Sequence, residues 1–160
     1  TSCTTVNGNP GIRANGYYGI SVRNGSVIGM GGAGISLYPT ISARVEEMLV
    51  VNNGWDGITL GAAGRVIRCR IGSNLQTGIL LGGPGGLAER NDVHANGYHG
   101  VMAADGSEIV GNQLIGNGQR GANVGASRIS ANVTVGNGLP LSGISMGDNL
   151  CVDTGIGTKC

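Results

Sequence analysis

Aromatic, acidic and basic residues recur at one point of a repeated pattern in this sequence. Glycines that precede an apolar residue mark the pattern, at positions 19, 34, 57, 78, 100, 121 and 143. Two residues before the marker stand Tyr17, Trp55, Gln76, Tyr98 and Gln119, and one residue before it stand Tyr18, Asp56, Thr77, His99 and Arg120. Flat aromatic faces suit sugar rings. These columns predict a carbohydrate-binding edge with Tyr17, Trp55, Asp56, Tyr98 and Gln119 as contacts. The alternative is that the rings only cover a turn and keep their polar tips in water.

The repeat that carries these columns predicts the fold. Alternating apolar residues follow each marker glycine for three or four residues, which indicates short strands separated by bends. Three such strands per period of about 22 residues predict an all-β, single-domain parallel β-helix, a solenoid of about six to seven coils. We expect residues 1–14 to be an irregular lead-in, 15–150 the β-helix and 151–160 a C-terminal loop. Coils spaced by about 4.8 Å would place the carbohydrate-binding edge along the stack as a groove.

Asparagines recur at the bends between the expected strands. Two columns are predicted to form structural ladders, one of Asn53, Asn74, Asn96 and Asn117 and one of Asn91, Asn112 and Asn132. Asn tolerates the left-handed conformation of a bend, and stacked amides can donate to one another from coil to coil. Cys69 takes an asparagine position in the second column, so we interpret it as a buried structural thiol.

The composition of the chain argues against nucleic acid and membranes as binding partners. The net charge is +1, which leaves no electrostatic footprint for nucleic acid or an anionic membrane, and no apolar run is long enough for a membrane span. We predict two stacked ion pairs, Glu47 with Arg68 and Arg70 with Asp92. The chain starts at Thr1 without a leader pattern. This fits either a mature secreted protein, extracellular or at the cell surface, or a cut domain.

Four cysteines are present, Cys3, Cys69, Cys151 and Cys160. Cys151 and Cys160 enclose a short glycine-rich loop, and we predict a disulfide that closes it. Cys3 has no evident partner. No C-x-x-C pair or nearby histidine accompanies these cysteines, so we expect neither a metal site nor a cofactor.

The N-G-x-x-G-[IV] cadence, the N-x-[ILV]-x-x-N pattern of residues 112–117 and the 22-residue period resemble a known family. They are similar to the right-handed parallel β-helix repeat of the pectate-lyase-like superfamily, over about residues 15–150. The resemblance implies a right-handed solenoid and an extracellular protein, and it is compatible with several roles. These include polysaccharide lyases, hydrolases and epimerases, phage tailspikes, adhesins and uncharacterised secreted bacterial β-helix proteins.

Two functions stay open. The first is an extracellular structural or surface protein without a catalytic site. Its copies would stack end to end into filaments, because exposed parallel edges can template further strands. The second is a polysaccharide-binding or polysaccharide-modifying module, of lyase or epimerase type, that uses an edge of Trp55, Tyr98, His99 and Arg120. The expected partners are further copies of the chain in the first case and a polysaccharide in the second.

Catalysis is the weaker expectation. Lyase or epimerase chemistry requires a base for the C5 proton of a uronate, an acid opposite and a cation beside the carboxylate. Tyr98, His99 and Arg120 offer these groups. The Asp-Pro-His motif of alginate epimerases resembles Asp92-Val93-His94, with valine in place of proline. Clustered carboxylates for calcium and paired carboxylates for hydrolysis are not apparent in adjacent coils.

Overall fold

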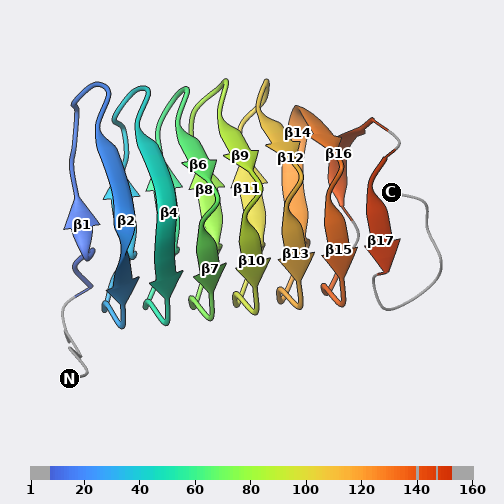
Figure 1. Ribbon diagram of the computed structural model, residues 1–160, viewed down its shortest axis with the longest axis horizontal. Helices are drawn as coiled ribbons and strands as arrows, with labels where there is room; N and C mark the ends of the chain where they lie inside the picture. Colours follow the sequence, from blue (N-terminus) through green and yellow to red (C-terminus); the bar gives the residue numbers. More distant parts are fainter. Residues whose placement is uncertain (1–7, 140, 147, 153–160) are drawn as a thin grey trace.

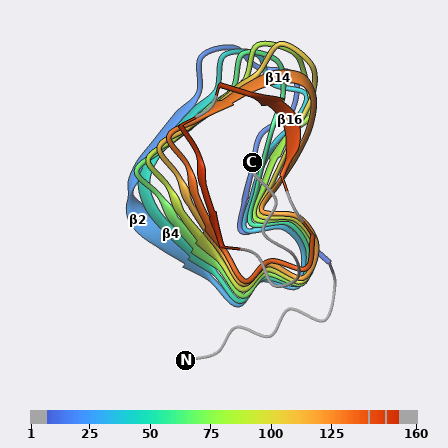
Figure 2. The same ribbon diagram turned by 90° about the vertical axis from the view of Figure 1, so that its right-hand side faces the viewer.

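The computed structural model describes residues 8–139, 141–146 and 148–152 of the 160-residue chain. These residues form seventeen β-strands and no helix, wound into a stack of about seven coils (Figure 1). All registered strand pairs are parallel. Viewed along the stack, the coils superpose closely (Figure 2). The predicted all-β, single-domain parallel β-helix is confirmed.

The strands form three faces. The first face contains β1 (Ile12–Arg13), β3 (Ile35–Leu37), β5 (Ile58–Leu60), β8 (Ile79–Leu81), β11 (Val101–Ala103) and the start of β14 (Ala122–Ser130). The second contains the starts of β2 (Ser21–Ile28) and β4 (Arg44–Val51), then β6 (Arg65–Ile67), β9 (Leu87–Glu89), β12 (Glu108–Val110), the end of β14 and the end of β16 (Ser142–Ser145), whose first residue pairs with β14 on the first face. The third contains the ends of β2 and β4, then β7 (Arg70–Gly72), β10 (Asp92–His94), β13 (Gln113–Ile115), β15 (Val133–Val135) and β17 (Leu150–Val152).

The core consists of aliphatic side chains stacked on like side chains. Strands of the first face bury their first and third residues, such as Ile58 and Leu60, and third-face strands bury the middle one, such as Ile71. All three are fully buried. Because side chains alternate along a strand, the middle residue of each first-face strand faces outward.

In the inner coils, each corner next to the third face contains one residue in the left-handed conformation. It directly precedes the ladder position, as in Arg90 (φ 53°) before Asn91 and Ala95 (φ 52°) before Asn96. The sequence-based assignment of this conformation to the ladder asparagines is therefore wrong at these corners. The asparagines are needed for their side-chain amides, and the residue before them accepts the strained backbone.

Both predicted asparagine ladders are present as hydrogen-bond chains. Each Oδ1 accepts from the coil before it: Asn74 donates its backbone N–H (3.2 Å) and its Nδ2 (2.9 Å) to Asn96 Oδ1. Asn91 donates in the same way to Asn112 Oδ1, at 2.9 Å from both nitrogens. Asn137 and Asn149 extend the two ladders by one coil each. The ladders satisfy polar groups that stacking removes from water.

Cys69 is buried, as expected from its place in a ladder column. Its backbone N–H donates to Asn91 Oδ1 (2.9 Å), and its thiol donates to the Ile67 carbonyl oxygen (3.4 Å). Burial raises the pKa of the thiol to about 11, so the group stays protonated at neutral pH. Cys69 is a hydrogen-bonded core residue.

The predicted register is wrong at both ends of the stack. Gly11, not Gly19, precedes the first coil's strand, because Ile12 pairs with Ile35, so β1 lies within residues 1–14. Gly143 is also out of register, because Ser142 pairs with Asn123. In the inner coils the marker glycine permits close approach: a Cβ at Gly78 would lie 2.7 Å from the Gly100 carbonyl oxygen.

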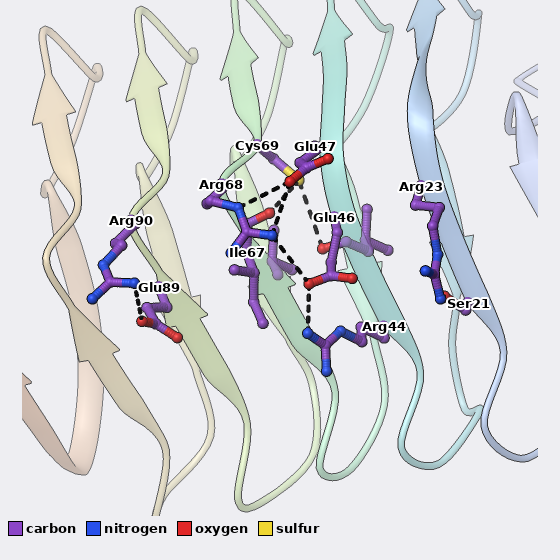
Figure 3. A network of polar contacts seen from close by, with 12 residues as sticks. Ser21, Arg23, Arg44, Glu46, Glu47, Ile67, Arg68, Cys69, Glu89 and Arg90 are labelled. Carbon is purple, nitrogen blue, oxygen red and sulfur yellow. Dashed lines mark hydrogen bonds and ion pairs between the residues drawn. The ribbon is translucent and has the colours of Figure 1, made fainter.

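Charged side chains form small networks on the second face and at its corner with the third (Figure 3).

Both predicted stacked ion pairs are confirmed. Arg68 lies 2.9 Å from Glu47 at that corner, and Arg70 lies 3.5 Å from Asp92 on the third face. These side chains are 40–65 % exposed, so each pair adds at most about 1 kcal/mol to stability.

The predicted disulfide involves residues that the structure describes only in part. Cys151 faces Thr134, whose hydroxyl lies 3.1 Å from its Sγ. Cys160 and Cys3 lie outside the described residues. The Cys151–Cys160 disulfide therefore stays a prediction.

Candidate functional site

The outward residues of the first face form the floor of a cleft near the N-terminal end of the stack. Arg13, Ser36 and Thr59 are the middle or final residues of β1, β3 and β5 and lie on three successive coils. The cleft has a volume of about 310 Å³ and is also lined by Gly8, Pro10, Ala33, Tyr38, Trp55 and Asp56. Its lining combines two aromatic rings with a few polar side chains placed between them.

Two aromatic side chains flank the cleft floor. Trp55 precedes β5 and Tyr38 follows β3, so they stand at opposite ends of the short first-face strands. Trp55 is 62% exposed and Tyr38 is 50% exposed. The Tyr38 ring reaches over Gly82, where a Cβ would lie 2.9 Å from the ring. Glycine at position 82 thus lets the tyrosine lie along the surface.

Asp56 presents a fixed carboxylate to the cleft. Its Oδ1 accepts from the Thr77 backbone N–H (3.0 Å), and its Oδ2 accepts from the Thr59 hydroxyl (3.3 Å). The residue is half-buried, and burial raises the pKa of its carboxyl above the usual range. Each oxygen keeps a lone pair for a further donor such as a sugar hydroxyl.

The predicted column of Trp55, Gln76, Tyr98 and Gln119 exists on successive coils. Backbone N–H groups donate from Gln76 to Trp55 O (3.2 Å), from Tyr98 to Gln76 O (3.1 Å) and from Gln119 to Tyr98 O (2.8 Å). Tyr17 does not join it. Its carbonyl accepts from Ile41 N–H (3.1 Å), and Tyr18 bridges to Ile41, in the loops that lead to the second face. The error follows from the misplaced marker at Gly19.

His99 is held inside the stack. It is 4% exposed, its Nδ1 accepts from the Arg120 backbone N–H (3.2 Å), and its Nε2 lies 3.0 Å from the Asn123 amide. Burial, and then the charge of Arg120, lower the pKa of His99. With both ring nitrogens in contact with protein, the geometry favours a structural role. Tyr98 remains exposed and packs on the imidazole, with ring centroids 4.2 Å apart.

Asp92 and His94 lie on the third face, around a corner from Tyr98. Asp92 Oδ1 is 3.2 Å from His94 Nδ1, and its other oxygen pairs with Arg70. The His94 ring covers Gly72. The structure therefore does not bring the Asp92-Val93-His94 motif into the cleft.

Seven of the nine lining residues were missed by sequence reasoning, and four of these bring polar or aromatic side chains to the cleft: Arg13, Ser36, Tyr38 and Thr59. Three of them could have been found, because Arg13, Ser36 and Thr59 each stand two residues after an in-register glycine and so face outward. Tyr38 has no periodic signal. In the described part of the chain, no three His, Cys, Asp or Glu side chains gather as a metal site would need, and no helix there is long and apolar enough to cross a membrane.

Comparisons with known proteins support the architecture. Residues 1–139 match the family described as the right handed beta helix region. A solved structure, the crystal structure of the periplasmic alginate epimerase AlgG, superposes with a TM-score of 0.67 at 19% sequence identity. The alignment covers 87% of this chain and 41% of that one, so this chain spans about two fifths of the epimerase structure. No curated protein sequence matches the chain.

Proposed function

The chain belongs to the right-handed β-helix family, and on this premise we propose that it binds a polysaccharide in the cleft between Tyr38 and Trp55. The observation that carries the proposal is the pair of exposed rings across a floor of hydrogen-bonding side chains. Successive coils, about 4.8 Å apart, would present such contacts to successive sugars of a chain lying along the stack. We further propose a periplasmic or extracellular location, where such polysaccharides occur.

Binding without turnover is the form of the proposal that the residues support best. An epimerase or lyase needs a base within reach of the substrate proton. His99 is buried and hydrogen-bonded, and Asp92 and His94 lie on another face. The epimerase similarity, at 19% identity, concerns the fold.

The test measures affinity for a panel of polysaccharides by affinity gel electrophoresis and isothermal titration. Trp55→Ala and Tyr38→Ala should each weaken binding about tenfold or more, the usual effect of truncating an aromatic anchor. Tyr18→Ala removes an aromatic residue that is 77% exposed outside the cleft and should leave affinity unchanged. Equal losses in all three variants, or no binding to any polysaccharide, would exclude the cleft.

End-to-end assembly is a second candidate, and a separate observation favours it. Among the described strands, β1 pairs only with β3 and β17 only with β15. No other described strand is registered with the outer edge of β1 or of β17. Such edges can pair with another copy.

A further inference from the structure

Charge inside the cleft suggests which class of polysaccharide it accepts. Of the nine lining residues only Arg13 and Asp56 carry charge, and these two are opposite in sign. The rest of the lining is aromatic, hydroxyl-bearing or small. The cleft therefore has no surplus of positive charge to offer a polyanion.

The surface beyond the cleft continues this pattern. Along the first face the outward column passes from Thr59 to Leu80 and Met102, which offer no charge. A second column, at the corner before the first face, contains Asp56, Thr77, His99 and Arg120 on successive coils. Arg120 is the first cationic side chain in this column after Asp56. Arg120 lies three coils from Asp56, or about 14 Å at 4.8 Å per coil.

A polyuronate lying along the stack would carry one carboxylate on every sugar. At least one of them would face the Asp56 carboxylate, which Thr59 and Thr77 hold in place. Arg13 is the one cation of the cleft, at its N-terminal end, and the carboxylates that lie over Leu80 and Met102 would have no counter-charge. Two like charges about 5 Å apart near a protein surface repel enough to weaken binding about tenfold.

A neutral hexose avoids this repulsion and uses the same groups. Its C6 hydroxyl can donate to the free lone pairs of Asp56, Arg13 can donate to a hydroxyl or ring oxygen, and its C–H faces can pack on Trp55 and Tyr38. Resting on the proposed function, we infer that this cleft selects neutral hexose polymers over polyuronates.

The experiment compares oligosaccharides that differ only at C6: β-1,4-linked mannohexaose against β-1,4-linked hexamannuronate, and cellohexaose against hexaglucuronate. Trp55 is the single tryptophan, so its fluorescence reports binding at the cleft directly. In low salt at pH 7.5 the better neutral hexamer should bind about tenfold tighter than its uronate partner. Raising the salt concentration should narrow the gap, because salt screens the repulsion.

Asp56→Asn keeps a side chain of the same shape and removes the charge, so it should raise uronate affinity severalfold and remove most of the preference. Glu108→Gln makes the same charge change on the second face, outside the cleft, and should preserve the preference. A uronate that binds wild type tighter than its neutral partner would overturn the inference and leave the proposed function standing. Absence of binding by both classes would overturn both. If Asp56→Asn fails to fold, the salt dependence of wild type tests the inference instead. A neutral-over-uronate preference that does not narrow as salt rises would contradict it.

Discussion

The imidazole of His99 connects two coils, so its protonation is coupled to the stacking of those coils. Nδ1 accepts a hydrogen bond from the Arg120 backbone, and a protonated Nδ1 would lose that bond. Burial already disfavours the charged ring and lowers the pKa of His99. The folded chain thus binds this proton more weakly than the unfolded chain, in which histidine has a pKa of about 6.5.

It follows that His99 destabilises the fold in acid. Its contribution is constant above the unfolded pKa of about 6.5 and is lost as the pH falls below that value toward the lowered folded pKa. The melting temperature of wild type should therefore fall more between pH 7.5 and pH 5 than that of His99→Gln, which keeps an acceptor for the Arg120 N–H. An unchanged pH profile in His99→Gln would refute this account.

The corners are the elements that align one coil with the next. A left-handed residue turns the chain, and the following asparagine joins coils through its amide. The asparagines of the inner coils are buried, so the removal of one amide leaves donors of its neighbour without an acceptor. Such a loss costs more than the net value of the hydrogen bond.

Asn96→Ala tests this element. Asn74 would lose the acceptor for its backbone N–H and its Nδ2, and Asn117 Oδ1 would lose one donor. We expect the free energy of unfolding to fall by about 2–4 kcal/mol, measured by urea denaturation. The control is Asn15→Ala, an exposed asparagine in the loop before β2, which should change stability by no more than about 0.5 kcal/mol. Equal effects at the two positions would show that the ladder has no special role.

As a whole, the molecule is a stack whose interior coils pair on both sides and whose first and last described strands pair on one. If copies join through these edges, sedimentation velocity should show species that grow with protein concentration, and negative-stain microscopy should show rods. Val152→Lys places a charge on β17 and should reduce the growth, since edge lysines oppose strand pairing. Val110→Lys makes the same change on β12, in an inner coil, and should leave the growth of the species unchanged. Species of constant size across concentrations would remove assembly from consideration.

The ladders and the aliphatic core were predictable because both depend on a local period. Apolar residues and asparagines recur at fixed offsets, and stacking like on like follows from the period alone. The same reasoning failed at Asn15-Gly-Tyr-Tyr-Gly19. This segment has the cadence of a corner but lies in a loop beside Ile41. Only strand pairing showed that Gly11 begins the first coil.

The sequence by itself determined a parallel β-helix with buried amide ladders, because every coil must repeat the same inward residues in order to bury them. Only the tertiary structure decided which outward residues meet. The cleft combines Arg13, Tyr38 and Asp56 from successive coils, and their proximity depends on register and on loop paths that no period encodes. Tertiary packing also placed His99 inside the stack, where its ring nitrogens join coils, while Trp55 stayed open to solvent.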